Sequence, residues 1–228
     1  MKPVRSGHEL IRLGGLNDGG YLIPNVLEGV TACFSPGVST NSSFEWDLAE
    51  LGVKCYLADY SVQGPPQDHP NFDFVKKYLD SVTSPTSITL SSWLEEKPVT
   101  GDLILQMDIE GFEYAVISST SSATLNQFRI IVLELHEFDS IVTSIGNWTV
   151  KNLLNRLLEN HSIVHIHPNN YGNPRKFFDK LLPRGIELTF LRNDFVNGSG
   201  FVEDFPNLLD QPNSLIYPDF ELDVKWFS

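Results

Sequence analysis

The sequence predicts an α/β fold: a single doubly wound, Rossmann-like sheet that is mostly parallel, with an antiparallel last strand. Short apolar runs alternate along the chain with segments of helical spacing, a pattern typical of βαβ units. Several of these runs end in a carboxylate or a histidine, which is where such sheets bind ligands. The length of 228 residues fits one domain of this kind with a substantial core.

We expect a single domain with three parts: an N-terminal arm at 1–28, a Rossmann-like core at 29–192 and a C-terminal tail at 193–228. The arm holds the glycine-rich run Gly14–Gly20 between two apolar segments. This pattern predicts a hairpin or a lid, because such residues tolerate positive φ. The Pro- and Asp-rich stretch after Phe205 is typical of a tail that wraps the surface.

The first part of the core predicts two strands and the helix between them. Val30–Phe34 is a short β-branched and apolar run, and a loop then leads to Ser42 or Ser43 as the cap of a helix. Apolar residues recur at helical spacing up to Gly52, which suits the left-handed position after a helix. Val53–Ala58 then predicts the second strand.

The middle of the core predicts buried parallel strands joined by helices. Phe72–Leu79 predicts a short helix, and Ile88–Leu90 predicts a brief third strand. Leu103–Met107 is almost continuously apolar, which is typical of a central strand covered on both faces. Glu113–Ile117 predicts a helix and Ile130–Leu133 another buried strand, so right-handed crossovers connect the parallel neighbours.

The end of the core predicts a long helix and two alternating strands. Trp148–Glu159 has the apolar spacing of an amphipathic helix, with Asn147 as its cap. Ile163–His167 alternates apolar residues with histidine and is expected to stop at Pro168. Ile186–Leu191 alternates as well, and we expect the final strand to run antiparallel to its neighbours.

The charge balance excludes some classes of partner. The chain has 16 Lys and Arg residues against 29 Asp and Glu residues, a formal net charge of −13. Such a field repels nucleic-acid phosphates and anionic membrane surfaces, so we expect no nucleic-acid and no membrane partner. Cys33 and Cys55 lie in apolar runs, where cysteine acts as a small buried hydrophobe. The N-terminal residues contain no apolar signal segment, and we expect a cytoplasmic protein.

The loop after the first strand and the end of the second strand predict a nucleoside-binding site. Gly37 would allow a ligand close to the backbone, and Ser39 and Thr40 offer donors at the start of a helix. Asp59, roughly twenty residues further on, could accept hydrogen bonds from both ribose hydroxyls. The alternative is an ordinary strand-to-helix turn followed by a turn-initiating aspartate.

Carboxylates and a histidine end the central strands. Asp108 and Glu110 follow the strand at 103–107 and share one side if that strand continues through them. Such groups need water, a cation, a ligand or backbone donors, although Glu110 could simply begin a helix. On the neighbouring strand, Glu134 and His136 offer a general base for an acceptor hydroxyl. The alternative for His136 is a strand-end histidine with a structural partner.

A recognisable set of motifs spans the chain: Asn17–Tyr21, the loop Phe34–Gly37, Asp59 after the second strand and, above all, Met107–Glu113 with the pattern Asp-x-Glu-Gly-x-Glu. From about Gly14 to Leu191 the chain therefore resembles the FkbM-type family of S-adenosylmethionine-dependent methyltransferases. It departs from that family at Gln106, where lysine is frequent, and at Ser91, where aspartate is frequent.

The resemblance implies a class I methyltransferase that uses S-adenosylmethionine to methylate a hydroxyl oxygen of a sugar-like or other small metabolite. The expected cofactor-binding residues are Asp18, Gly37, Ser39, Thr40, Asn41, Asp59, Asp108 and Glu110, and the expected catalytic residues are Asp108, Glu134 and His136. Two alternatives remain: a nucleoside-binding module without catalysis, and an NAD-dependent oxidoreductase on a similar fold. The lack of a G-x-G-x-x-G loop counts against the second.

A divalent cation, either Mg²⁺, Mn²⁺ or Zn²⁺, is a further hypothesis for the site. Asp108 at one strand end and Glu134 with His136 at the next offer ligands that suit such an ion. The cation would lower the pKa of the acceptor hydroxyl. The competing hypothesis needs no metal and uses His136 as the general base, oriented by Glu134 or Asp108.

Overall fold

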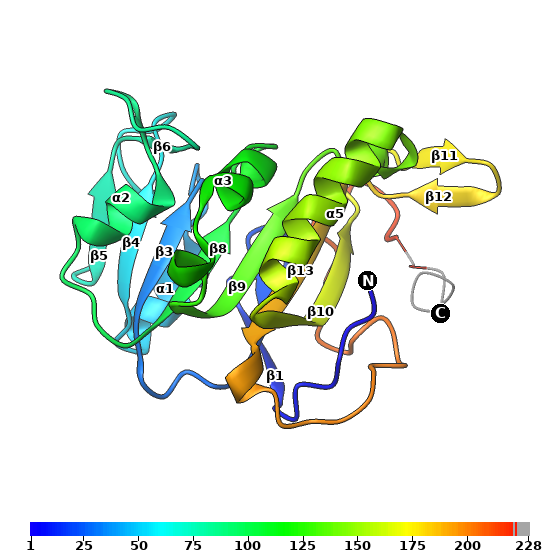
Figure 1. The fold of residues 1–228 in the computed structure, drawn as a ribbon, viewed down its shortest axis with the longest axis horizontal. Helices are drawn as coiled ribbons and strands as arrows, with labels where there is room; N and C mark the ends of the chain where they lie inside the picture. The colour runs from blue at the N-terminus through cyan, green and yellow to red at the C-terminus, as the bar shows by residue number, and fades with distance from the viewer. Residues whose placement is uncertain (221, 223–228) are drawn as a thin grey trace.

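The computed structural model describes residues 1–220 and 222. Within these residues, a seven-stranded sheet forms the centre of the molecule (Figure 1). Its strands, in spatial order, are β10 (His161–Asn169), β13 (Gly185–Arg192), β9 (Phe128–Leu135), β8 (Asp102–Met107), β3 (Val30–Pro36), β4 (Lys54–Ala58) and β5 (Phe72–Val75). β13 runs antiparallel to β9 and β10, whereas the other neighbouring pairs are parallel. The predicted sheet with an antiparallel last strand is therefore confirmed.

Alternation along the central strands divides the core into two layers. Phe34, Leu105 and Ile131 face the layer that contains the apolar residues of α2 (Leu90–Glu95), α3 (Glu113–Ser119) and α5 (Ser144–Leu158). Cys33 and Ile104 face the opposite layer, which contains residues of α1 (Ser43–Glu50) and of the N-terminal arm. Because both faces of β3 and β8 are covered, these strands need near-continuous apolar sequence.

The N-terminal arm is a hairpin, as its sequence predicts. β1 (Leu10–Leu13) pairs antiparallel with β2 (Tyr21–Pro24). Tyr21 and Ile23 are buried in the same layer as α1, and the Thr189 hydroxyl of β13 donates a 2.7 Å hydrogen bond to the Leu22 carbonyl. The arm thus covers the part of the sheet that lies beside α1.

The segment after β4 corrects two predictions. Phe72–Leu79 is not a helix, because Phe72–Val75 forms the parallel edge strand β5 and the chain continues into β6 (Tyr78–Leu79). β6 pairs with β7 (Ser87–Ile88) in a small separate sheet, so the expected strand Ile88–Leu90 ends at Ile88. Thr89 then caps α2 by accepting a hydrogen bond from the Ser92 amide.

Two further boundaries differ from the prediction. α5 begins at Ser144, because the side chain of Thr143 accepts a hydrogen bond from the Gly146 amide and caps the helix before Asn147. β10 continues past Pro168 to Asn169. It is the edge strand of the sheet, and a proline is tolerated at an edge because no ladder hydrogen bond is required of its nitrogen.

The remaining elements lie between and after the strands: α4 (Ser122–Leu125), η1 (Phe138–Val142), β11 (Arg175–Phe177), β12 (Lys180–Leu182) and η2 (Asn193–Phe195). β11 and β12 form a hairpin that projects from the body of the molecule (Figure 1). Among the described residues, no helix has the length and apolarity needed to span a membrane. Cys33 and Cys55 are buried and unbridged, as their apolar surroundings predict.

Candidate active site

A cavity of about 650 Å³ opens at the carboxyl edge of the sheet, beyond the ends of β3, β4 and β8. Its volume lies in the range of small-molecule sites, about 300–1,000 Å³. Its walls include every residue expected to bind a cofactor: Asp18, Gly37, Ser39, Thr40, Asn41, Asp59, Asp108 and Glu110. Residues from the arm, the loop after β3 and the loop after β8 are therefore gathered at one place.

Asp59 joins two of the loops around this cavity. It follows β4, and its side chain accepts hydrogen bonds from the Ser39 amide at 2.8 Å and from the Ser61 amide and hydroxyl at 2.7 Å. A carboxylate has about four acceptor positions, so it could still accept a bond from a ligand. Binding of a ribose diol by Asp59 remains a prediction, and the observed role of its carboxylate is to fix the loop after β3.

The reason for the glycine at position 37 differs from the sequence interpretation. Gly37 has φ +89°, and a Cβ at this position would lie 1.6 Å from the backbone oxygen of Asp108. The glycine is thus required by the close approach of the loops after β3 and β8. The space that a side chain at position 37 would occupy is filled by protein backbone and not by a ligand, although Gly37 does line the cavity.

The arm contacts the cavity through Asp18. Asn41 donates from its side-chain amide to the backbone oxygen of Asp18 at 2.6 Å, while its side-chain oxygen accepts from the Ser43 amide. The Gly14 amide donates to Asp47 of α1 at 2.7 Å. These bonds attach the glycine-rich run to α1 and to the loop before it.

Glu45, Gln106 and Asp80 also belong to the cavity wall but were not among the predicted site residues. Glu45 and Gln106 are buried, and the Ser35 hydroxyl lies 2.5 Å from the carboxylate of Glu45 and 2.7 Å from the side-chain oxygen of Gln106. Asp80, which follows β6, lines the same cavity. The buried position of Glu45 was detectable, since it falls on the apolar stripe of α1; Asp80 was hidden by the incorrect helix.

Burial raises the pKa of Glu45 to about 7. The wall contains the carboxyl groups of Asp18, Glu45, Asp59, Asp80, Asp108 and Glu110, and it includes no Lys, Arg or His from the described residues. The cavity therefore suits a ligand that carries positive charge, because an opposite charge would stabilise these carboxylates.

Glu113 organises the loop after β8. It is fully buried, and its Oε1 atom accepts hydrogen bonds from the Ile109 amide at 3.0 Å and the Gly111 amide at 3.3 Å. β8 ends at Met107 and Glu110 has φ +57°, so the strand does not continue through Asp108 and Glu110, although both side chains line the cavity and approach His136 Nε2. The loop instead folds around the Glu113 carboxylate.

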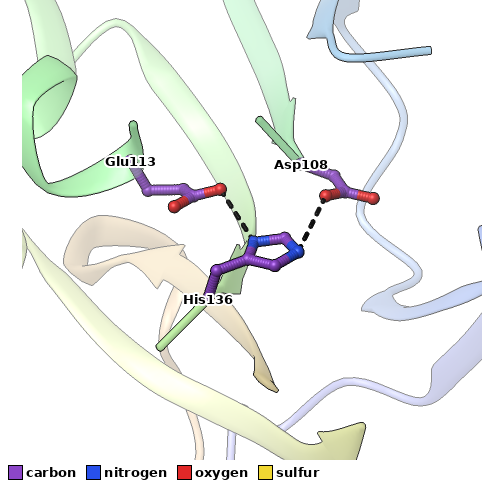
Figure 2. A group of neighbouring side chains, drawn as sticks. All are labelled: Asp108, Glu113 and His136. Atoms are coloured by element: carbon purple, nitrogen blue, oxygen red, sulfur yellow. Dashed lines mark hydrogen bonds and ion pairs between the residues drawn. The ribbon is translucent and has the colours of Figure 1, made fainter. Parts of the chain in front are cut away.

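The same carboxylate oxygen holds His136, which follows β9. Glu113 Oε1 lies 3.1 Å from His136 Nδ1, and Asp108 Oδ1 lies 3.7 Å from His136 Nε2. Figure 2 shows the imidazole ring between these two carboxylates. Nε2 is also 3.4 Å from Glu110 and 3.9 Å from Glu134. The predicted residues Asp108, Glu134 and His136 are therefore close together, and Glu113, the last residue of the Asp-x-Glu-Gly-x-Glu motif, is a further partner whose role the sequence did not indicate.

The carboxylates and His136 perturb one another. Burial alone would lower the pKa of His136, but the hydrogen bond and charge of Glu113, with Asp108 and Glu110, raise it to about 9. Burial raises the pKa of Asp108 to about 7, and His136 opposes that rise. Burial also raises the pKa of Glu134 well above its ordinary value, and its side chain accepts a 2.5 Å hydrogen bond from Asn169.

The donor set for a metal differs from the predicted one. Atoms of Asp108, Glu113 and His136 lie within 4.8 Å of one another, the spacing that a shared cation needs. The predicted set has Glu134 in place of Glu113. Glu113 Oε1 is already an acceptor for backbone amides, so a cation would have to share it or use the other oxygen. Metal binding by either set remains a hypothesis.

Comparison with known proteins gives one family. A family model described as methyltransferase FkbM domain matches residues 48–166, slightly more than half of the chain. No curated protein matches the sequence.

Solved structures show weak similarity. The precorrin-6y C5,15-methyltransferase from Geobacter metallireducens GS-15 is 10% identical at a TM-score of 0.41, over 72% of this chain and 82% of that one. A chain of a fibrillarin/Nop5p complex is 12% identical at a TM-score of 0.43, over 71% and 72% of the two chains. Similarity at this level supports no argument about chemistry.

Proposed function

The chain belongs to the methyltransferase FkbM domain family, and from this premise we propose that it transfers the methyl group of S-adenosylmethionine to a hydroxyl oxygen of a small, sugar-like metabolite. Membership of the family accounts for methyl transfer and for S-adenosylmethionine as the donor. The hydroxyl acceptor is our own proposal, and the geometry around His136 supports it.

The residues of the cavity fit this donor. Bound there, S-adenosylmethionine would supply an electrophilic methyl group on a positively charged sulfur. The wall offers carboxylates and no basic side chain from the described residues, which suits the sulfonium and the amino group. Asp59 would accept from the ribose hydroxyls, and the loop at Ser39 and Thr40 would hold the carboxylate at the start of α1.

The observation that carries the proposal is the position of His136. Glu113 accepts a hydrogen bond from Nδ1–H, and Nε2 lies 3.7 Å from Asp108, a cavity residue. Because the pKa of His136 is raised to about 9, Nε2 is protonated at neutral pH and becomes free to act as a base as the pH rises toward that value. Methylation of a hydroxyl requires loss of its proton, whereas an amine can attack through its lone pair before any proton leaves. A histidine held in this way is therefore most useful for a hydroxyl acceptor.

The proposed step is an in-line displacement with balanced atoms. The acceptor oxygen forms a bond to the methyl carbon, the carbon–sulfur bond breaks with its electrons on sulfur, and His136 Nε2 takes the hydroxyl proton. Asp108 stabilises the imidazolium that results. The protein contributes alignment, proton removal and charge placement, and it needs no covalent nucleophile.

The alternatives differ in what they require of the cavity. An NAD-dependent oxidoreductase must bind a pyrophosphate, which an acidic wall disfavours. A nucleoside-binding module without catalysis would have no use for the Glu113–His136 pair. In the metal hypothesis, Asp108, His136 and either Glu134 or Glu113 would hold a divalent cation, and its chemistry would be to lower the pKa of the acceptor hydroxyl.

Calorimetric titration with S-adenosylhomocysteine and with NAD separates the donors, and we expect binding of the first alone. Methyl transfer to a panel of hydroxylated small molecules is then measured for the wild type and for His136→Ala. A rate loss of about 10²–10⁴-fold is expected for that variant. His69→Ala is the matched control, because His69 is also a partly buried histidine paired with a glutamate, Glu50, and lies outside the cavity wall.

An unaffected His136→Ala variant would remove the general base from the mechanism. The same assay after exhaustive chelation, and after addition of Mg²⁺, Mn²⁺ or Zn²⁺, tests the metal hypothesis. Full activity in the chelated enzyme would exclude it.

A further inference from the structure

The hairpin β11–β12 exposes apolar side chains without a covering element among the described residues. Within the part of the chain that the structure describes, its two strands pair only with each other. Phe178 is 83% exposed, Leu181 50% and Phe177 39%. An isolated two-stranded hairpin is marginally stable in water. These exposed apolar side chains therefore do not stabilise the hairpin by forming a core within it.

Phe178 is also unfavourably placed for the turn itself. It lies at the tip of the hairpin with φ +54°, a conformation that glycine or asparagine adopts readily and a bulky residue rarely does. An aromatic side chain here costs conformational energy and exposes apolar surface to water. Such a residue at a projecting tip is a reason to look for a binding role.

A second exposed apolar group lies at the start of α5. Ile145 is 80% exposed and Trp148 is 67% exposed, and residues three apart are neighbours on a helix surface. The ion pair between Arg175 of β11 and Asp139 of η1, at 3.6 Å, joins the hairpin to the segment that leads into α5. Both elements therefore belong to the same end of the molecule (Figure 1).

Basic side chains accompany both groups. Lys176 and Arg175 are exposed on β11, Lys180 is half-buried on β12, and Lys151 is exposed on the second turn of α5. Asp179, also exposed, shares the turn with Phe178, so the hairpin has three basic side chains against one acidic one, and Arg175 pairs with Asp139. The whole chain has a net charge of −13, which opposes approach to an anionic surface. That charge is why the sequence predicts no membrane partner. At physiological ionic strength, however, charges beyond about 8 Å are largely screened, so the excess of basic over acidic side chains on the hairpin decides the interaction at its projecting tip.

We propose that this end of the molecule, formed by the β11–β12 hairpin and the first turns of α5, docks on an anionic lipid surface. Phe178 and Trp148 enter the interface between headgroups and acyl chains, where aromatic side chains are favoured. Lys176 and Lys151 contact the anionic headgroups.

A lipid surface fits this end better than a second copy of the chain. Two separate apolar groups, each with an exposed aromatic residue and a nearby lysine, match a soft, negatively charged boundary, whereas another copy would bring its own lysines against these. The helix α5 follows the carboxyl end of β9, and the hairpin follows the carboxyl end of β10. Docking would thus bring the edge of the sheet that holds the candidate site to the membrane. This last consequence depends on the proposed function, but the docking itself does not.

Co-sedimentation of the full chain with lipid vesicles tests the proposal. We expect binding to vesicles of phosphatidylcholine mixed with phosphatidylglycerol, and little binding to phosphatidylcholine alone. Phe178→Ser should weaken binding about tenfold or more, as loss of a buried aromatic side chain predicts. Lys176→Glu should weaken it by about fivefold for each unit of charge changed.

Leu51→Ser is the matched control, because Leu51 is 61% exposed at the far end of α1 and its loss should leave vesicle binding unchanged. Absence of binding to the anionic vesicles would overturn the proposal, and so would an equal loss in the control. Sedimentation velocity identifies the competing occupant: self-association of the wild type that Phe178→Ser abolishes would assign this end to a dimer interface. Neither result bears on donor binding or on methyl transfer.

Discussion

Replacement of Glu113 by glutamine tests the arrangement of the site most directly. The buried carboxylate accepts hydrogen bonds from the Ile109 and Gly111 amides and from His136 through one oxygen, at 3.0–3.3 Å. Glutamine keeps the size and an acceptor oxygen but removes the negative charge. The exchange should therefore alter the protonation of His136 more than the shape of the loop.

The stability cost follows from these contacts. A hydrogen bond to a charged group contributes about 1.5–3 kcal/mol and one between neutral groups about 0.5–1.5 kcal/mol, so Glu113→Gln should lower the free energy of unfolding by about 1–3 kcal/mol. Glu113→Ala leaves the Ile109 and Gly111 amides buried without this acceptor, and about 3–5 kcal/mol is expected.

The effect on catalysis depends on the pKa of His136. Glu113 helps to raise that pKa to about 9 from an ordinary value of 6.5, and a general base must be neutral. Methyl transfer by the wild type should therefore increase with pH up to about 9. In Glu113→Gln the pKa falls toward its ordinary value, so the rate reaches its plateau at lower pH. The plateau itself should be lower, by on the order of 10²-fold or less, because the ring is held less firmly.

NMR titration of the His136 ring in the wild type and in Glu113→Gln measures the change in pKa, and thermal unfolding reports stability. Glu45→Gln is the control, since Glu45 is a buried carboxyl of the cavity wall that does not contribute to the perturbation of His136. If the pKa of His136 stays at about 9 in a folded Glu113→Gln protein, Glu113 does not position the base and the reasoning fails.

Three further results are expected. Asp59→Ala should weaken binding of S-adenosylhomocysteine by about 1.5–3 kcal/mol in calorimetry, with a smaller loss in Asp59→Asn, and undiminished affinity in the folded alanine variant would remove Asp59 from the site. Burial raises the pKa of Glu187 to about 8, so the stability that its protonated form contributes is complete below pH 4.5 and is lost as the pH rises to about 8. The melting temperature of Glu187→Gln should therefore fall less steeply with pH than that of the wild type. An identical pH dependence in the two proteins would contradict the raised pKa of Glu187. If Gly14–Gly20 is a lid, its amides should exchange with solvent more slowly when S-adenosylhomocysteine is bound, whereas equal protection with and without the ligand would identify a fixed hairpin.

The central strands could be predicted from sequence because a strand that is buried on both faces requires a continuous run of apolar residues. Leu103–Met107 and Ile130–Leu133 were found in this way, and each lies within a strand of the sheet. The edge strand β5 was not found, since its residues are half-buried and an edge imposes a weaker pattern. Proline at 168 likewise misled the prediction, because only position in the sheet reveals that β10 is an edge.

Part of the candidate site could also be predicted from sequence, and part could not. Asp59 and Asp108 could be expected to line one cavity, and Asp108 to lie beside His136, since the carboxyl ends of parallel strands share one edge of a sheet. The role of Glu113 could not, because a glutamate in the first turn of a helix looks in sequence like a favourable helix start. Its carboxylate meets the Ile109 amide and His136 only because the intervening loop turns through the left-handed conformations of Glu110 and Gly111. The contact that requires Gly37 likewise joins two loops far apart in the chain. Local periodicity records which residues are buried, whereas the partner of each buried polar group depends on how distant loops pack together.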